Sequence, residues 1–172
     1  MPEAEDPVVI VEYDPSWPRM FEEEKARIIT AAGKWIMTIE HIGSTAVPGL
    51  GGKPIIDLLA GVRVLALAAS CVPRLGSIGY LYHPEKEGTL PERGYFDKPS
   101  YHLHMVEESS DFWSRHIAFR DHLRRHPETA MRYLDLKRAM AQKYRVDREG
   151  YTAAKTHFIV STLKKAGYVS KV

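Results

Sequence analysis

Residues 39–59 read IEHIGSTAVPGLGGKPIIDLL, and this stretch decides the fold prediction. It predicts a strand, a loop rich in glycine, and a second apolar strand that carries one acid, Asp57. Glycine lets the backbone N–H groups of such a loop approach an anion closely, and Lys53 adds a cation beside them. A carboxylate in an apolar strand is costly to bury unless it binds a metal, a cation or a polar ligand. The stretch therefore predicts a site for phosphate and a metal ion.

The rest of the chain divides into a part with strands and a part with helices. We expect strands over 8–13, 35–42, 54–62, 79–83, 94–97 and 101–107, helices over 17–32 and 63–75, and a polar, turn-rich loop over 84–91. Apolar residues then recur at helical spacing and predict three helices between 111 and 166. This order indicates an α+β fold. We expect one domain over 1–172, with the sheet in 1–110 and a three-helix cap in 111–172.

Length and composition limit the class of protein. A chain of 172 residues, 44% hydrophobic and 27% charged, fits one soluble globular domain with a sizeable core. No apolar run approaches the roughly 20 residues that span a bilayer, so we expect no membrane association. The first six residues, MPEAED, are acidic and do not resemble a secretory signal. The single cysteine, Cys71, excludes an internal disulfide, and we expect a cytoplasmic protein.

Charge is unevenly distributed along the chain. Residues 111–172 contain 14 Lys and Arg against 6 Asp and Glu, whereas residues 1–110 contain 10 against 16. This difference favours an anionic ligand near the C-terminal half, although solvated helix faces explain many of the same charges. No basic stripe interleaved with aromatic residues is present, which argues against nucleic acid as the partner. The sequence carries no signal for an oligomeric state.

The wording EHIGSTAVPGL followed by KPIIDLL resembles the GrpB family, whose members resemble the nucleotidyltransferase fold of the polymerase-beta type. Segments 8–20, 101–107, 113–126 and 147–158 also resemble GrpB segments, in the same order. The resemblance covers nearly the whole chain and implies a nucleotidyltransferase-like mixed sheet with flanking helices. GrpB-like sequences also occur as a domain appended to some dephospho-CoA kinases, which implies a link to coenzyme A synthesis.

The resemblance also gives Asp57 a role. The usual members of that fold place two acids two residues apart on this strand, where they hold divalent ions that bridge phosphate oxygens. Here Leu59 stands at the second position. The resemblance therefore implies one divalent cation, Mg²⁺ or Mn²⁺, with Asp57 as a catalytic residue and metal ligand. The alternative is a structural acid that is bonded to the loop amides.

A pair of histidines is the next candidate. His102 and His104 flank Leu103 on a predicted strand, so both rings point to the same face. A neutral imidazole is a metal ligand, and it can also act as a general base. Histidines with this spacing are more often ordinary core or surface residues. Because the segment resembles GrpB, we predict that both join Asp57 as catalytic residues and metal ligands.

Five residues are candidates for binding phosphate or nucleotide. Gly43, Ser44 and Thr45 offer backbone N–H groups and hydroxyls, although ordinary turns select the same residue types. Lys53 stands at a strand entry, a suitable place to bind a phosphate. Arg120 lies on the first C-terminal helix, and a guanidinium binds phosphate through two parallel hydrogen bonds.

Three further residues are weaker candidates. Lys155 of the last predicted helix is a candidate phosphate ligand of the same kind as Arg120. Glu40 and His41 directly precede the loop. Side chains alternate along a strand, so one of them faces the site and the other the core, and the sequence leaves open which.

These residues lead to one functional hypothesis and two alternatives. We predict a protein that binds a nucleotide or other phosphorylated metabolite and transfers a nucleotidyl or phosphoryl group with one divalent cation. The first alternative is a catalytically degenerate module. Such a module binds a phosphorylated metabolite, or it stabilises a partner enzyme of coenzyme A synthesis. The second is a metal-dependent phosphohydrolase, which uses the same residues with water as the acceptor.

Overall fold

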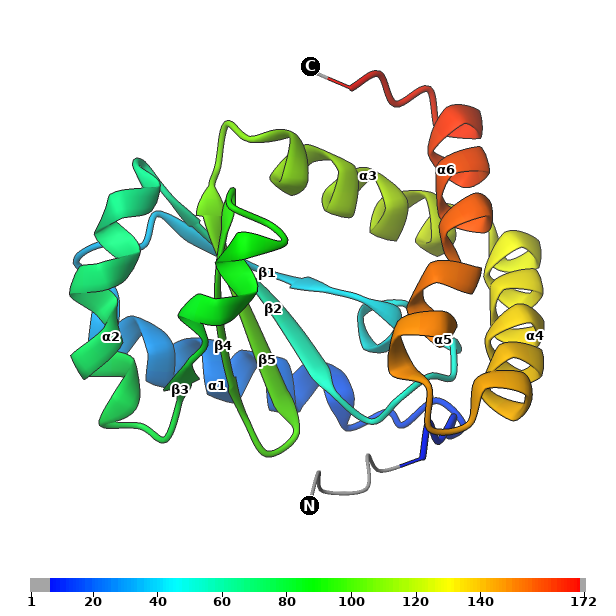
Figure 1. Ribbon diagram of the computed structural model, residues 1–172, viewed down its shortest axis with the longest axis horizontal. Helices are drawn as coiled ribbons and strands as arrows, with labels where there is room; N and C mark the ends of the chain where they lie inside the picture. The colour runs from blue at the N-terminus through cyan, green and yellow to red at the C-terminus, as the bar shows by residue number, and fades with distance from the viewer. Residues whose placement is uncertain (1–6, 171–172) are drawn as a thin grey trace.

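The structure is a computed structural model that describes residues 7–170, so the acidic segment 1–6 lies outside the described residues. A five-stranded mixed sheet has the order β1-β2-β5-β4-β3 (Figure 1). β2 and β5 run parallel, and the other neighbouring pairs are antiparallel. The strands are β1 Thr38–Ile42, β2 Ile56–Val62, β3 Leu81–Tyr82, β4 Arg93–Lys98 and β5 Tyr101–Glu107. The predicted α+β fold with a mixed sheet is confirmed.

One face of the sheet is covered by α1, Trp17–Ala32, and α2, Ala68–Gly76 (Figure 1). Leu58 of β2 and Leu103 of β5 belong to the same fully buried cluster as Ile28 of α1. Strands that are covered on both faces consist of nearly continuous apolar residues, which is the pattern that β2 shows. The apolar run of the sequence therefore forms the centre of the sheet.

The opposite face carries the predicted site residues. Asp57 and Leu59 of β2 lie on this face with His102 and His104 of β5, because side chains alternate along a strand. The parallel register pairs Asp57 with His102 and Leu59 with His104. Helix α3, Asp111–Arg125, packs against this face. Two adjacent central strands thus give the candidate residues a rigid base.

The C-terminal part contains four helices between residues 111 and 165, one more than we predicted. They are α3, α4 Pro127–Tyr144, α5 Arg148–Ala154 and α6 Thr156–Lys165. The predicted third helix is divided at Lys155, whose backbone N–H bonds to the carbonyls of Thr152 and Ala153 instead of continuing the α-helical pattern. Figure 1 shows α4, α5 and α6 together beyond one end of the sheet.

The loop between β1 and β2 is held between the sheet and these helices. Val47 and Leu50 of the loop are buried in one cluster with Leu123 of α3 and with Tyr133 and Leu134 of α4. Helices α3 and α4 therefore pack against the glycine-rich loop and fix its position beside Asp57.

The expected strand over 8–13 was wrong. Only Val11 forms a bridge, to Gly52, with N···O distances of 2.9 and 3.0 Å, so the segment runs along the loop and outside the sheet. Two other boundaries differ. The second predicted helix begins with a 3₁₀ turn at Leu65–Leu67, and the turn-rich loop contains a short 3₁₀ helix, Pro84–Gly88. Within residues 7–170, none of the helices has the length and apolar character needed to cross a membrane.

Candidate functional site

Asp57 lies against both predicted histidines and is within hydrogen-bond distance of His104. Its Oδ1 lies 3.2 Å from His104 Nε2 and 3.6 Å from His102 Nδ1, and its side chain is 28% exposed. Burial opposes ionisation of the carboxyl group, but the hydrogen bonds from His102 and His104 hold its pKa well below the usual value. Asp57 is therefore an ionised carboxylate at neutral pH, and the three catalytic candidates form one cluster.

The protonation of His104 follows from its second contact. Arg93 Nη1 lies 3.3 Å from His104 Nδ1, and a guanidinium has only donors, so Nδ1 accepts. The proton of the neutral ring is then on Nε2, which donates to Asp57. Burial lowers the pKa of His104, which favours this neutral form. Neither nitrogen of His104 has a free lone pair, so His104 fits neither a general base nor a metal ligand in this arrangement.

This arrangement limits the predicted metal site. Among residues 7–170, no group of three or more His, Cys, Asp or Glu side chains is arranged to hold a metal ion. Asp57 and His102 remain as donors of the right kind. A resident metal needs more ligands than these two supply, so the residues do not fit a resident ion.

Leu59, at the position of the usual second acid, is fully buried with Ile42, Val106 and Phe112. An acid here would lie in an apolar cluster under α3, which is unfavourable unless the acid is paired. The apolar surroundings of Leu59 therefore suit a leucine at this position better than the usual second acid.

The loop brings Gly43 into direct contact with Asp57. Gly43 has φ 76°, and a Cβ atom built on it would lie 2.7 Å from Asp57 Oδ2. A side chain at this position would therefore be strained by its backbone conformation and would also displace the carboxylate. Gly43 permits the loop to pass close to the acid.

Gly43→Ala is expected to lower the free energy of unfolding by about 1–3 kcal/mol from backbone strain, and to move Asp57 as well. The measurement is urea denaturation together with a binding titration of pyrophosphate. Gly49→Ala is the matched control, because Gly49 has φ 79° but no atom within 4 Å of its added Cβ. The two variants share the strain, and Gly43→Ala alone should weaken binding. Equal binding by both variants would contradict a role for the contact between Gly43 and Asp57.

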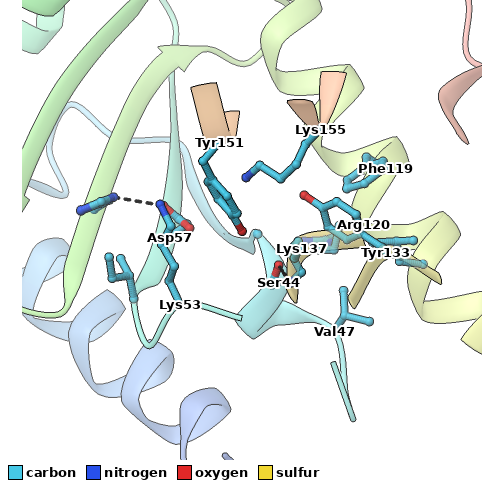
Figure 2. Close-up of a pocket in the computed structure, with 14 residues that line it drawn as sticks. Ser44, Val47, Lys53, Asp57, Phe119, Arg120, Tyr133, Lys137, Tyr151 and Lys155 are labelled. Carbon is cyan, nitrogen blue, oxygen red and sulfur yellow. Dashed lines mark hydrogen bonds and ion pairs between the residues drawn. The ribbon is translucent and has the colours of Figure 1, made fainter. Parts of the chain in front are cut away.

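Beside Asp57 lies a cavity of about 190 Å³, and three lysines line it (Figure 2). Lys53 follows the loop, Lys137 lies on α4, and Lys155 separates α5 from α6. Asp57 is the one carboxylate among the described residues that line this cavity. The lining residues are Gly43, Ser44, Val47, Lys53, Ile55, Asp57, His102, Phe119, Arg120, Leu123, Tyr133, Lys137, Tyr151 and Lys155.

Lys137 is the most buried of the three, with 2% of its surface exposed. Its Nζ donates to Ser44 Oγ at 2.6 Å and to the Gly51 carbonyl at 2.5 Å. Burial, followed by the charges of Lys155, Arg138 and Lys53, lowers the pKa of Lys137 to about 7. Ser44 thus lines the cavity, and its hydroxyl accepts a hydrogen bond from Lys137.

The other two lysines lie over one aromatic ring. Lys155 Nζ lies 4.3 Å and Lys53 Nζ 4.8 Å from the ring centroid of Tyr151. Burial and the charge of Lys53 lower the pKa of Lys155 to about 8, and burial and Arg148 lower that of Lys53, while Asp57 opposes both shifts. Figure 2 shows Tyr151 and Lys155 reaching from the helical part toward Asp57 and Lys53. Three ammonium groups therefore share a small space with one carboxylate.

Sequence reasoning missed Lys137 and Tyr151. Lys137 falls four residues after Tyr133, inside the apolar stripe of its helix, and a lysine in such a stripe is a signal for a buried cation. Tyr151 lies on a predicted helix and is 1% exposed. Only the structure shows that it borders the cavity.

Arg120 lines the cavity, and its Nε and Nη1 donate to neighbouring residues. Its Nε donates to Asp121 at 2.9 Å, and its Nη1 donates to Glu40 at 2.5 Å and to the His41 carbonyl at 3.0 Å. Two carboxylates already neutralise the guanidinium. The contacts of Arg120 therefore join α3 to β1, and its role as a phosphate ligand stays a prediction. Glu40 is the residue on the site face of β1.

Thr45 and His41 also serve the loop. Thr45 is 2% exposed, lies outside the cavity lining, and donates to the Ile55 carbonyl at 3.3 Å. His41 Nε2 lies 2.9 Å from Thr45 Oγ1, and its ring stacks on Phe21 at 4.7 Å. Burial and nearby arginines lower the pKa of His41 to about 4. The hydroxyl of Thr45 is therefore directed into the fold, away from the space where we predicted a phosphate.

Comparison with known sequences identifies the family. A family model described as GrpB protein matches residues 7–165. Glutamate-rich protein GrpB of Alkalihalophilus pseudofirmus is 34% identical over 167 residues, which cover 92% of this chain and 95% of that protein. UPF0157 protein YqkA of Bacillus subtilis is 34% identical over 92% of this chain but 47% of its own length, so the chain spans about half of that relative. A protein named dephospho-CoA kinase, from Mycolicibacterium paratuberculosis, is 27% identical over 95% of this chain and 47% of its own length.

Solved structures agree with this assignment. The crystal structure of conserved protein GrpB from Enterococcus faecalis matches with a TM-score of 0.82 at 35% identity, covering 92% of this chain and 96% of that one. A chain in the structure of the GLD-2/RNP-8 complex matches with a TM-score of 0.56 at 12% identity, covering 86% and 60%, which shows a likeness of fold alone. The predicted family and fold are thus confirmed. The chain belongs to the GrpB family.

Proposed function

We propose that the lysine-lined cavity binds the phosphates of a nucleotide or other phosphorylated metabolite. The observation that carries this proposal is the convergence of Lys53, Lys137 and Lys155 on a cavity with Asp57 as its one carboxylate among the described lining residues. Buried like charges without counterions are costly, and the lowered pKa values of all three lysines express that cost. A polyanionic ligand removes the cost by supplying the missing negative charge.

A divalent cation fits this proposal as a companion of the ligand. Mg²⁺ is commonly held by one or two carboxylates together with substrate phosphates, and it keeps several waters. Asp57 borders the cavity and would provide the protein ligand, while phosphate oxygens and water would provide the rest. The ion, when bound, neutralises charge on the phosphates.

We further propose that the bound compound donates a nucleotidyl or phosphoryl group. In that transfer the acceptor oxygen forms a bond to phosphorus, and the bond from phosphorus to the departing phosphate breaks. The lysines stabilise the charge that develops on the departing oxygens. His102 is placed to accept the proton of the acceptor hydroxyl, because its Nδ1 faces Asp57 and no described residue bonds to its Nε2.

A catalytically degenerate binding module is the second candidate. Leu59 in its apolar cluster favours it, because one acid remains where the usual pattern has two. The relative named dephospho-CoA kinase makes precursors of coenzyme A natural test ligands. Hydrolysis of the same compound, with water as the acceptor, is a further possibility that the same assay detects.

The test is a thermal-shift panel followed by ³¹P NMR. Nucleoside triphosphates, pyrophosphate and coenzyme A precursors are expected to raise Tm, because a ligand that binds only the folded state stabilises it. Mn²⁺ should increase the shift with pyrophosphate in the wild type and not in Asp57→Asn. New ³¹P signals with an acceptor support transfer, and inorganic phosphate alone indicates hydrolysis. Binding without turnover supports the degenerate module, and no shift with any phosphorylated compound contradicts the proposal.

A further inference from the structure

A second cavity adjoins the first on the other side of Asp57. Its volume is about 240 Å³, and Gly43, Asp57, Phe119 and Tyr133 line both cavities. The rest of its wall comes from different elements than those that carry the lysines. These residues are Ile42, His104, Arg115, His116, Ile159 and Leu163.

His116 offers this cavity a hydrogen-bond acceptor. Its Nδ1 lies 2.7 Å from the Phe112 carbonyl oxygen, which only accepts, so Nδ1 carries the proton of the neutral ring. Nε2 then has a free lone pair, and no residue in the described part of the chain bonds to it. The ring is fixed by stacking on Phe112, with centroids 4.0 Å apart. Burial lowers the pKa of His116 to about 4, so the ring is neutral at pH 7.

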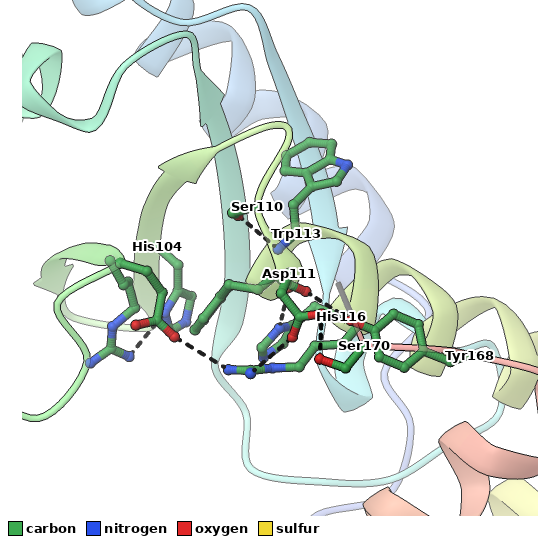
Figure 3. A network of polar contacts seen from close by, with 11 residues as sticks. His104, Ser110, Asp111, Trp113, His116, Tyr168 and Ser170 are labelled. Carbon is green, nitrogen blue, oxygen red and sulfur yellow. Dashed lines mark hydrogen bonds and ion pairs between the residues drawn. The ribbon is translucent and has the colours of Figure 1, made fainter. Parts of the chain in front are cut away.

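The second cavity lacks the excess positive charge of the first. No lysine lines it within residues 7–170, and its arginine is paired. Arg115 Nη1 lies 3.6 Å from Asp111, and its Nη2 lies 3.9 Å from Glu92. Figure 3 shows Asp111 also held by Tyr168 and Ser170, which fixes this ion pair at the start of α3. The wall therefore combines apolar side chains with the acceptor on His116, the edge at Asp57 and the paired guanidinium of Arg115.

We propose that the second cavity binds the uncharged organic part of the phosphorylated ligand, through a hydroxyl or N–H group that donates to His116 Nε2. This inference rests on the proposed function, which places the phosphates among the lysines on the other side of Asp57. Ile159 and Leu163 pack against the hydrocarbon portion of that group. The cavity, about 240 Å³, is smaller than the roughly 300–1,000 Å³ of a typical ligand pocket, so the group is compact.

The test uses phenol and its methyl ether anisole, which differ in the O–H donor. Binding is followed on ¹³C-labelled methyl groups of Ile159 and Leu163 by NMR. We expect phenol to shift these signals and anisole to bind roughly three- to tenfold more weakly, because anisole leaves the acceptor without a donor. Pyrophosphate should leave phenol binding in place, since the two probes occupy different cavities.

Two variants locate the interaction. His116→Phe keeps the stacked ring and removes the acceptor, and it should abolish the preference for phenol while pyrophosphate binding is unchanged. Ile159→Phe narrows the cavity and should weaken both probes. Equal binding of phenol and anisole, no binding of phenol, or a preference that survives in His116→Phe overturns the inference. Failure of pyrophosphate to bind instead overturns the proposed function, so the two failures are distinguishable.

Discussion

Replacing Lys137 with methionine is expected to weaken pyrophosphate binding by roughly ten- to a hundredfold at a pH below 7. Hydrogen bonds between charged partners are worth about 1.5–3 kcal/mol, and about 1.4 kcal/mol corresponds to a factor of ten in affinity. Methionine has a similar length and no charge, so it fills the same buried position on α4. Isothermal titration calorimetry with pyrophosphate measures the effect directly.

Two comparisons separate phosphate binding from a general loss of positive charge. Lys143→Met removes the same charge from the exposed surface of α4, outside the cavity, and should leave the affinity nearly unchanged. Adenosine should bind the wild type and Lys137→Met equally, whereas ATP should distinguish them. If Lys137→Met and Lys143→Met weaken pyrophosphate to the same extent, the cavity is not the phosphate site and only overall charge matters.

Arg120 provides a further contrast, because its contacts join α3 to β1. The guanidinium is already paired with Glu40 and Asp121. Arg120→Met should therefore reduce stability in urea more than it reduces pyrophosphate affinity. A selective loss of affinity at full stability would support Arg120 as a phosphate ligand.

Much of the fold was predictable because it depends on local patterns. The apolar run that contains Leu58 has the composition of a strand covered on both faces, and the alternation around Leu103 placed His102 and His104 on one face. The segment at residues 8–13 shows the limit of such reasoning. Its β-branched residues favour a strand, but whether a strand forms depends on a partner, and only Gly52 pairs with Val11.

The site was predictable where its residues lie on the two central strands and their loop. The strand, loop and strand pattern placed Gly43 and Lys53 beside Asp57, and the resemblance to GrpB placed His102 with them. Lys137 could not, because it is 80 residues beyond Asp57 in the chain and approaches through the packing of α4 on the loop. The partner of Arg120 was not predictable either. The position of Arg120 on α3 does not indicate that its guanidinium contacts Glu40 of β1.

Without ligand, the free energy of unfolding should keep rising between pH 7 and 9, a range where many proteins have passed their maximum stability. The pKa of Lys137 falls from 10.5 in the unfolded chain to about 7 in the folded one. Between these values the unfolded chain binds more protons, so stability increases with pH, by up to about 1.4 kcal/mol per pH unit for one such group. Lys155, with a pKa of about 8, adds a shift of the same sign. Cys71 opposes the rise above pH 9, because its raised pKa of about 11 makes the folded chain bind one more proton there, which offsets one of the two lysines.

Urea denaturation at pH 7, 8 and 9 tests this dependence and links it to the ligand. Lys137→Met should reduce the rise to the part that Lys155 contributes, because methionine binds no proton in either state, whereas Lys143→Met should retain the full rise. Saturating sulfate, a tetrahedral anion whose charge is constant over this range, should also flatten the rise, because a bound anion returns the lysines toward their charged form. A flat profile in the unliganded wild type would show that the lysines are solvated and that folding does not lower their pKa values. A rise that sulfate leaves unchanged would instead show that folding lowers the lysine pKa values but that the cavity does not bind an anion.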